Sequence, residues 1–239
     1  MKYENKELLG NYKTKAEEHW FTIFNPILNY LGNLKGKKVL DVGCGTGEFT
    51  YELSKRAGQV VGIDLSKKWI ESCRVQFKKD NLRFIQQNAN DLKNFKSEYF
   101  DVVIMNMVVP NIYIASGMRK VFKEISRVTK KSGDFVFSDL HPVCVMTKKA
   151  GRREQKYSKD FSYLKEGAKF SAFVTLPDGK KIEFDDAHWS LGFYADVLNE
   201  SGLRINKIIE SEYPENAPKK FYRHPFPEYI TFCCKKLKK

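Results

Sequence analysis

Short apolar runs alternate with segments of helical period between residues 38 and 140. Runs rich in Val, Ile and Phe predict buried strands, and apolar residues spaced three or four apart predict helices that cover a sheet. Helical spacing recurs around 70–77 and 121–128. The five predicted strands have the sequences KVLDVG, QVVGIDL, LRFIQQ, FDVVIMN and DFVFSDL. This alternation predicts a parallel sheet with crossover helices.

The alternation stops at His141 and resumes near Trp189. Between them, KFSAFVT and KKIEFDD flank Pro177-Asp178-Gly179, a turn signal that predicts a β-hairpin. A helix at 189–201 and two strands, RINKIIESE and EYITFCCK, are expected to follow. The predicted fold class is therefore α/β: a Rossmann-like, seven-stranded, mostly parallel sheet with helices on both faces and a β-hairpin insertion after the fifth strand.

An amphipathic helix is predicted before the sheet, with Pro26 inside its pattern as an expected kink or break. Its apolar face is Trp20, Phe24, Ile27, Leu28 and Leu31. We predict a single domain over 1–239, with an N-terminal helical lid at 1–34 and a sheet core at 35–140. A lid and substrate insertion is expected at 141–188, and a C-terminal helix with two strands at 189–239.

Hydrophobic residues make up 42% of the 239 residues, which is enough for a folded core, and the formal net charge is +13. Such a charge fits nucleic acid, an anionic substrate or an anionic membrane surface. Most of the 42 basic residues are Lys, however, and they are scattered along the chain. Because specific phosphate and base recognition favours the planar Arg fork, a solvated Lys-rich surface is the preferred interpretation.

Five cysteines without a C-x-x-C pair predict reduced, buried thiols and no metal site. The N-terminus lacks the pattern of a secretory signal, and the longest apolar run is too short to span a bilayer. We therefore expect a cytoplasmic protein with no membrane partner. The oligomeric state is not predicted.

The stretch VLDVGCGTGEFT, residues 39–50, places three glycines between a strand and a helix start. A dinucleotide-binding loop needs its third glycine where Glu48 stands. Glu48 and Asp41 are poor neighbours for a pyrophosphate, but both suit a ligand that carries positive charge.

The pattern Asp41-x-Gly43-x-Gly45-x-Gly47, with Cys44 inside it, resembles the first motif of class I S-adenosylmethionine-dependent methyltransferases. The ligand of that family has an ammonium and a sulfonium. The resemblance covers 34–138 and implies that S-adenosyl-L-methionine is the cofactor.

Further residues match the family in order along the chain. Asp64 stands where relatives have an acid that accepts both ribose hydroxyls, and Leu65 would lie against the adenine. Asn88-Ala89 stands where relatives have an acid followed by Ala to contact the adenine amino group. The acid is replaced by an amide here, so Asn90 or Asp91 is an alternative for that contact.

The family uses the positions of Asn106 and Met107 for the methionine end of the cofactor and for the acceptor. This chain lacks the Asn-Pro-Pro-Tyr of enzymes that methylate base or glutamine amines, and the Pro-Cys nucleophile of cytosine-carbon methyltransferases. Together with His141-Pro142 and His188-Trp189, these absences make the chain similar to the small-molecule, type 11-like branch of the family.

If the acceptor is a hydroxyl, a base would assist methyl transfer, and imidazole titrates in the right range. His188 and His141 are the candidate catalytic residues. The aromatic residues expected to line an acceptor pocket are Tyr12, Trp20, Phe173, Trp189 and Tyr194.

The resemblance implies an enzyme that methylates an O or N atom of a small-molecule acceptor. The first alternative is an RNA methyltransferase, because of the charge of +13. The second, of another class, is a non-catalytic cofactor-binding or interaction protein.

Overall fold

The computed structural model describes residues 18–147, 149–150, 153–175, 179, 181–215, 217 and 225–238. Tyr12 and the predicted turn residues Pro177 and Asp178 lie outside these ranges. None of the described helices is long and apolar enough to cross a membrane.

In the described part of the chain, seven strands form one sheet in the order β10, β11, β5, β4, β1, β2, β3. Neighbouring strands from β3 to β5 are parallel, whereas β11 runs antiparallel to both β5 and β10. The predicted mostly parallel sheet is confirmed. Its strands are β1 Lys38–Val42, β2 Gln59–Asp64, β3 Leu82–Gln86, β4 Phe100–Asn106, β5 Thr129–Leu140, β10 Leu203–Glu210 and β11 Tyr229–Lys236.

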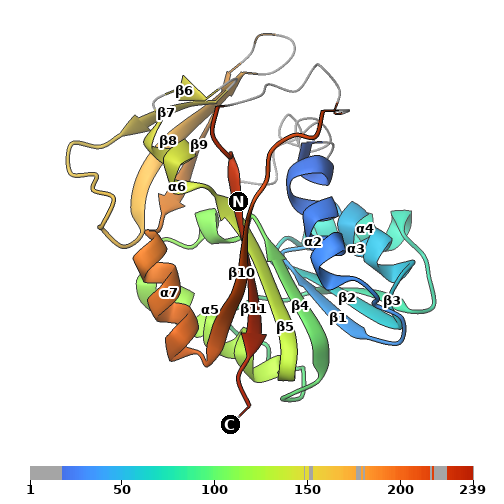
Figure 1. The fold of residues 1–239 in the computed structure, drawn as a ribbon. Helices are drawn as coiled ribbons and strands as arrows, with labels where there is room; N and C mark the ends of the chain where they lie inside the picture. The colour runs from blue at the N-terminus through green and yellow to red at the C-terminus, as the bar shows by residue number, and fades with distance from the viewer. Residues whose placement is uncertain are drawn as a thin grey trace.

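Helices cover both faces of this sheet (Figure 1). On one face, α5 and α7 enclose a core around Phe122, Phe137 and Val197. On the other face, α2, α3 and α4 enclose a core around Ile27 and Val39. The helices are η1 Trp20–Phe24, α2 Asn25–Leu31, α3 Glu48–Ser54, α4 Lys67–Gln76, η2 Val109–Asn111, α5 Ala115–Val128, α6 Pro142–Met146 and α7 Leu191–Glu200.

The predicted break at Pro26 is present. Residues 20–24 form a π-helical segment, and an α-helix begins at Asn25 with the proline in its first turn. Proline is tolerated there because its missing N–H would have no partner within the helix.

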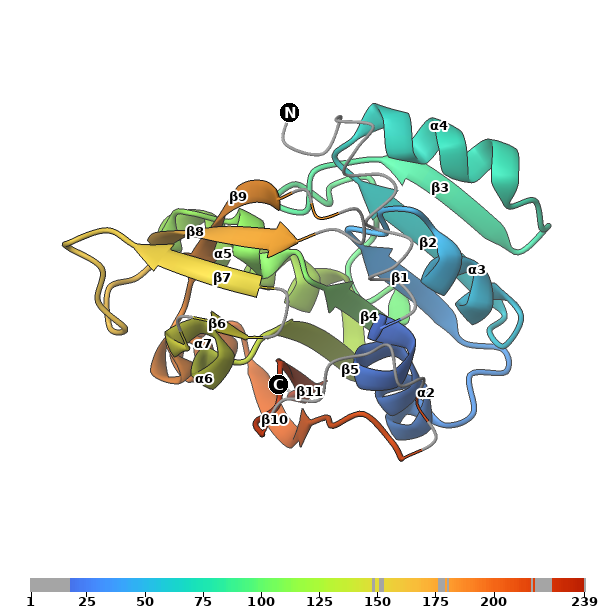
Figure 2. The ribbon, with the colours of Figure 1, turned by 90° about the horizontal axis from the view of Figure 1, so that it is seen from above.

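The insertion after β5 is larger than the predicted hairpin. The hairpin strands β8 Ala168–Thr175 and β9 Lys181–His188 are present, but β6 Lys149–Ala150 and β7 Arg153–Tyr157 extend them to a four-stranded antiparallel sheet. Figure 2 shows this inserted sheet from above, beside the edge at which β1 and β4 end.

The strand order reverses between β1 and β4, because the chain goes from β1 to β2 and β3 and then returns to place β4 on the other side of β1. Such a switch point leaves a crevice at the carboxyl ends of the strands, where α/β proteins bind ligands.

Candidate functional site

A cavity of about 530 Å³ lies at this switch point. It is lined by residues that follow β1, β2, β3 and β4, by the start of α3, and by His19 and Phe24 from the N-terminal helical segment. The volume is within the range of pockets that hold a cofactor or small ligand. The residues of the cofactor prediction that line it are Asp41, Gly43, Cys44, Gly45, Asp64, Leu65, Asn88, Ala89, Asn106 and Met107.

The glycine loop is held against the end of β2. The backbone N–H groups of Gly43 and Cys44 both donate to the carbonyl of Ile63, at 2.7 and 2.9 Å. Gly43 has φ of +74°, and a Cβ there would lie 2.2 Å from Val108 Cγ2, beyond the end of β4. Only glycine lets the two strand ends approach this closely.

Gly47 does not line the cavity. It is the N-cap of α3 with φ of 85°, and a Cβ there would lie 2.7 Å from Cys73 Sγ. Its role is to turn the chain from the loop into the helix, so that the first turn of α3 begins at the cavity. Cys44 does line the cavity, and its hydrogen bond to Cys73, together with burial, raises the pKa of its thiol well above the usual range.

Asp64 joins the loop to the next helix. Its Oδ2 accepts from the N–H of Gly45 at 2.9 Å, and its Oδ1 accepts from the N–H of Ser66 at 2.8 Å. Burial raises the pKa of this carboxyl. Each carboxylate oxygen can accept a further hydrogen bond, so the pair can still receive two hydroxyl groups from a ligand.

Asp41 is 3% exposed, and its Oδ2 accepts a hydrogen bond of 2.6 Å from Thr50 Oγ1. Burial raises its pKa to about 6. The charged side chains among the described lining residues are Asp41, Glu48 and Asp64, all of them carboxylates. A cavity with this charge favours a ligand with positive groups and disfavours a pyrophosphate.

At the β3 end, the cavity wall is formed by residues 87–90. Asn88 Oδ1 accepts from the N–H of Asn90 at 3.1 Å, which folds the segment into a turn. Asp91, one of the alternatives for the adenine contact, does not line the cavity and pairs with Lys93 instead. Leu65, which follows β2, also lines the cavity and is 52% exposed, so it offers an apolar surface to a flat ligand.

At the β4 end, Asn106 lines the cavity, and neither atom of its buried side-chain amide has a hydrogen-bond partner among the described residues. Buried polar groups without partners are costly, so this amide is suited to a bound ligand. Met107 follows with φ of 55°, a conformation rare for a residue with a side chain, and its N–H donates to the carbonyl of Ser138 at 3.0 Å.

The two predicted catalytic histidines do not line the cavity. His188 is 2% exposed, its Nε2 donates to the carbonyl of Tyr163 at 3.1 Å, and burial lowers its pKa to about 4. His141 caps α6: its Nδ1 accepts from the N–H of Val143 at 3.1 Å, and its Nε2 donates to Glu210 at 2.8 Å. Both rings are therefore engaged within the protein, and these positions do not support a catalytic role.

The predicted acceptor residues within the described ranges, Trp20, Phe173, Trp189 and Tyr194, do not line the cavity either. Trp189 is buried and stacks on Phe193, and Tyr194 is buried with its hydroxyl donating to Asp139. In the sequence, aromatic residues of the core and of a pocket look alike, so these two could not be assigned to either.

Phe173 lies on β8 with the Lys156 ammonium 4.7 Å from its ring centre. Trp20 contacts the edges of Phe24 and Phe49, with ring centres 5.2 and 6.2 Å away. Trp20 therefore packs against two lining residues without lining the cavity itself.

Sequence reasoning missed several lining residues. His19 and Phe24 come from the N-terminal segment, and Phe49 from α3 stacks on Phe24 at 4.2 Å. Tyr113, beyond η2, lines the cavity and donates its hydroxyl to the carbonyl of Asp185 on β9 at 2.9 Å. The sequence signal that pointed toward Phe24 was its position four residues after Trp20, on the same face of the predicted helix.

The chain matches the sequence model of a methyltransferase domain over residues 33–193. It is 31% identical over 172 residues to the demethylmenaquinone methyltransferase of Lactococcus lactis, a match that covers 64% of this chain and 65% of the relative. It is 35% identical over 107 residues to the ribosomal protein L11 methyltransferase of Dictyoglomus thermophilum, covering 44% and 33%. Both matches span less than two thirds of the relative's own length.

Among solved structures, an S-adenosylmethionine-dependent methyltransferase from Clostridium acetobutylicum superposes with a TM-score of 0.64 at 19% identity. The superposition covers 95% of this chain and 99% of the other. At this identity the similarity concerns the fold alone.

Proposed function

The chain belongs to the family of S-adenosylmethionine-dependent methyltransferases, and from that premise we propose that it methylates an O or N atom of a small-molecule acceptor. Family membership makes the chain an enzyme with S-adenosyl-L-methionine as its cofactor. The proposal adds the class of acceptor, a small molecule methylated on O or N.

The described residues fit the cofactor. The carboxylate oxygens of Asp64 are suited to the ribose hydroxyls, Leu65 to the adenine face, and the acidic lining to the ammonium and sulfonium. When bound, S-adenosylmethionine supplies an electrophilic methyl group on sulfur. The chain's own task is to orient the acceptor and to exclude water.

A small acceptor is supported by the ring side chains and the buried amide in the cavity lining. His19, Phe24 and Phe49 supply ring surfaces to the cavity lining, and the amide of Asn106, the last residue of β4, supplies a donor and an acceptor. No Lys or Arg of the described ranges lines the cavity, so an RNA phosphate would find no cation near the reacting end. The observation that carries the proposal is this combination of apolar rings and a buried amide that has no partner among the described residues.

The relatives support this acceptor class only in part. The name of the Lactococcus relative specifies demethylmenaquinone, whereas the name of the Dictyoglomus relative specifies a ribosomal protein. A macromolecular acceptor therefore stays the alternative.

We test the acceptor class by transfer of label from methyl-labelled S-adenosylmethionine. The purified chain is offered a panel of ring hydroxyls and amines, and in parallel total tRNA and rRNA. Incorporation into at least one ring compound is expected. Stoichiometric label at one RNA position at physiological salt, with none in the panel, would replace the proposal by the RNA alternative.

His19 takes the place of His188 as the proposed acceptor-facing histidine, because it lines the cavity and His188 does not. If His19 accepts the proton of a hydroxyl acceptor, His19→Gln should lower kcat by ~10²-fold or more with cofactor affinity unchanged. The matched control is His188→Gln, which keeps an N–H near the carbonyl of Tyr163 and should leave kcat unchanged. Equal losses in both variants would exclude this assignment.

A further inference from the structure

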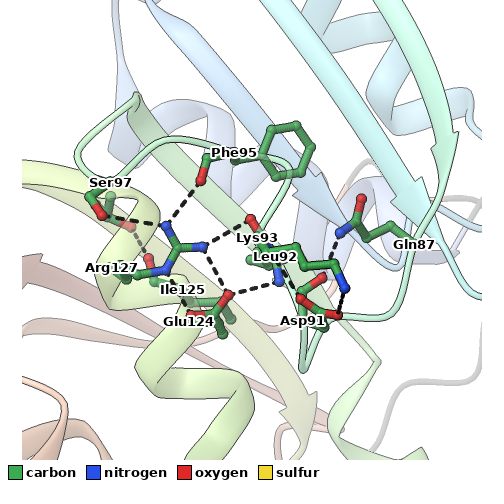
Figure 3. A network of polar contacts seen from close by, with 10 residues as sticks. Gln87, Asp91, Leu92, Lys93, Phe95, Ser97, Glu124, Ile125 and Arg127 are labelled. Atoms are coloured by element: carbon green, nitrogen blue, oxygen red, sulfur yellow. Dashed lines mark hydrogen bonds and ion pairs between the residues drawn. The ribbon is translucent and has the colours of Figure 1, made fainter.

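Two charged side chains on α5, Glu124 and Arg127, bind the segment that joins β3 to β4 (Figure 3). They form an ion pair with two hydrogen bonds: Arg127 Nε donates to Glu124 Oε1 at 2.7 Å, and Nη2 donates to Oε2 at 2.9 Å. This side-by-side geometry fixes both side chains relative to each other.

The pair binds the backbone of Leu92 from both sides. The N–H of Leu92 donates to Glu124 Oε2 at 2.8 Å, and its carbonyl accepts from Arg127 Nη2 at 2.9 Å. Arg127 Nη1 also donates to the carbonyl of Phe95 at 3.0 Å. The Leu92 side chain is fully buried, so this part of the segment is anchored by packing as well as by hydrogen bonds.

A short chain of contacts connects Leu92 to the cavity. The N–H of Asp91 donates to the carbonyl of Asn88 at 3.1 Å, and the side-chain amide of Gln87 donates to the carbonyl of Asp91. The N–H of Gln87 in turn donates to the carbonyl of Asp64 at 3.0 Å. Residues 87–90 form the cavity wall at the β3 end, but Glu124 and Arg127 do not line the cavity.

We propose that Glu124 and Arg127 are positioning residues for the nucleoside end of the cofactor, which they control through the segment 87–92. The proposal rests on the proposed use of this cavity by S-adenosylmethionine. The wall residues come from a connection without helix or strand, whose backbone position is not set by a ladder of hydrogen bonds. The ion pair on the rigid helix α5 supplies that position instead.

The test compares Arg127→Gln and Arg127→Lys with wild type. Affinities for adenosine and for S-adenosylhomocysteine are measured by calorimetry. Both substitutions remove the planar fork, so both ligands should bind ~3- to 30-fold more weakly, the size typical of residues that act through their neighbours. Adenosine lacks the amino-acid end of S-adenosylhomocysteine. An equal loss of affinity for the two ligands would therefore mean that the substitution weakens binding of the nucleoside. In turnover, KM for S-adenosylmethionine should rise while kcat at saturation stays near wild type.

The matched control is Arg119→Gln on the same helix, whose guanidinium pairs with Glu200 and Glu166 instead. It should leave adenosine affinity unchanged. If Arg127→Gln does not fold, Glu124→Gln provides the same comparison.

An unchanged adenosine affinity in the folded Arg127 variants, or an equal loss in Arg119→Gln, would overturn the inference. A wild-type chain that binds neither ligand would instead contradict the proposed use of the cavity, so the two failures are distinguishable.

Discussion

Asp41 and Asp64 carry the same functional group at neighbouring strand ends, but their surroundings give them different tasks. Asp64 is held by two backbone N–H groups and keeps lone pairs for a ligand, whereas Asp41 is almost fully buried with one hydroxyl donor. Asp64 is suited to hydrogen bonding with a ligand, and Asp41 is suited to attracting a positively charged group. Each role leads to its own prediction.

Replacing Asp64 by Ala should weaken binding of S-adenosylhomocysteine by ~1.5 to 3 kcal/mol, the cost of losing hydrogen bonds to a charged group. The variant also frees the N–H of Gly45, which adds to the loss. Calorimetry measures the change, and Asp80→Ala, at an exposed position, is the control. An unchanged affinity would remove Asp64 from the cofactor site.

Affinity for S-adenosylhomocysteine should increase as the pH rises from 5 to 7. The ligand's ammonium favours the ionised form of Asp41, whose pKa is about 6 in the folded chain. At pH 5 only about a tenth of this carboxyl is ionised, so binding should be roughly tenfold weaker than at pH 7. Asp41→Asn should bind more weakly at pH 7 and lose this pH dependence. A pH profile that is unaltered in Asp41→Asn would assign the effect to another group, Asp64 first.

The raised pKa of Asp41 has the opposite consequence for the stability of the ligand-free chain: a higher pH favours ligand binding but lowers the free energy of unfolding. The folded state holds the Asp41 proton more tightly than an unfolded chain, in which this pKa is near 3.8. The destabilising contribution of this group therefore grows as the pH rises from about 4 to about 6. Ligand binding and stability can thus be separated by their pH profiles.

The glycine loop and Asp64 were predictable from the sequence because a loop of this kind needs particular residues at particular positions. The histidines were not. Whether an imidazole at a strand end faces the cavity or a carbonyl depends on the packing of a neighbouring loop, here residue Tyr163. No local pattern in the sequence specifies that contact.

Among the elements, the seven main strands were predictable because each contains several β-branched, aromatic or other apolar residues. The strands β6 and β7 were not, because residues 149–157, KAGRREQKY, are mostly polar and show no period-two alternation. β6 is the edge strand of the inserted sheet, and β7 lies between it and β8.

The inserted sheet contacts the cavity wall through Tyr113, whose hydroxyl donates to the carbonyl of Asp185. Tyr113→Phe removes one hydrogen bond between neutral groups, worth ~0.5 to 1.5 kcal/mol. If the insertion sets the shape of the acceptor side, KM for the acceptor should rise about 2- to 10-fold by that free energy, with cofactor affinity unchanged.

The control for Tyr113→Phe is Ser171→Ala. It removes a hydrogen bond to the side chain of the same Asp185 but lies away from the cavity lining. A KM change of equal size in both variants would mean that β9 as a whole was disturbed.

At the scale of the whole molecule, the charge of +13 and the acidic cavity are separate features. The positive charge is carried by Lys and Arg side chains outside the described lining, whereas the cavity presents carboxylates. Attraction of a polyanion to the surface therefore does not draw its phosphates into the cavity, whose charged lining residues are carboxylates.

Binding of tRNA should accordingly be weak, insensitive to sequence and steeply dependent on salt. With roughly four phosphate contacts, the affinity should fall by about 100-fold between 50 and 200 mM salt. Fluorescence anisotropy with two unrelated RNAs measures this. A salt-resistant affinity for one of them would indicate a specific RNA site.

The four strands of the inserted sheet follow one another in the chain, and in the described residues they pair with each other and not with the main sheet. A residue gained or lost between 149 and 188 therefore leaves the register of the seven main strands unchanged. In evolutionary terms, a change in the length of this segment alters what the insertion offers to Tyr113 at the cavity wall, while the strands that carry the glycine loop and Asp64 keep their pairing. New acceptors can then arise in a lineage through changes on the insertion side of the cavity, with the strand pairing on the cofactor side inherited unchanged.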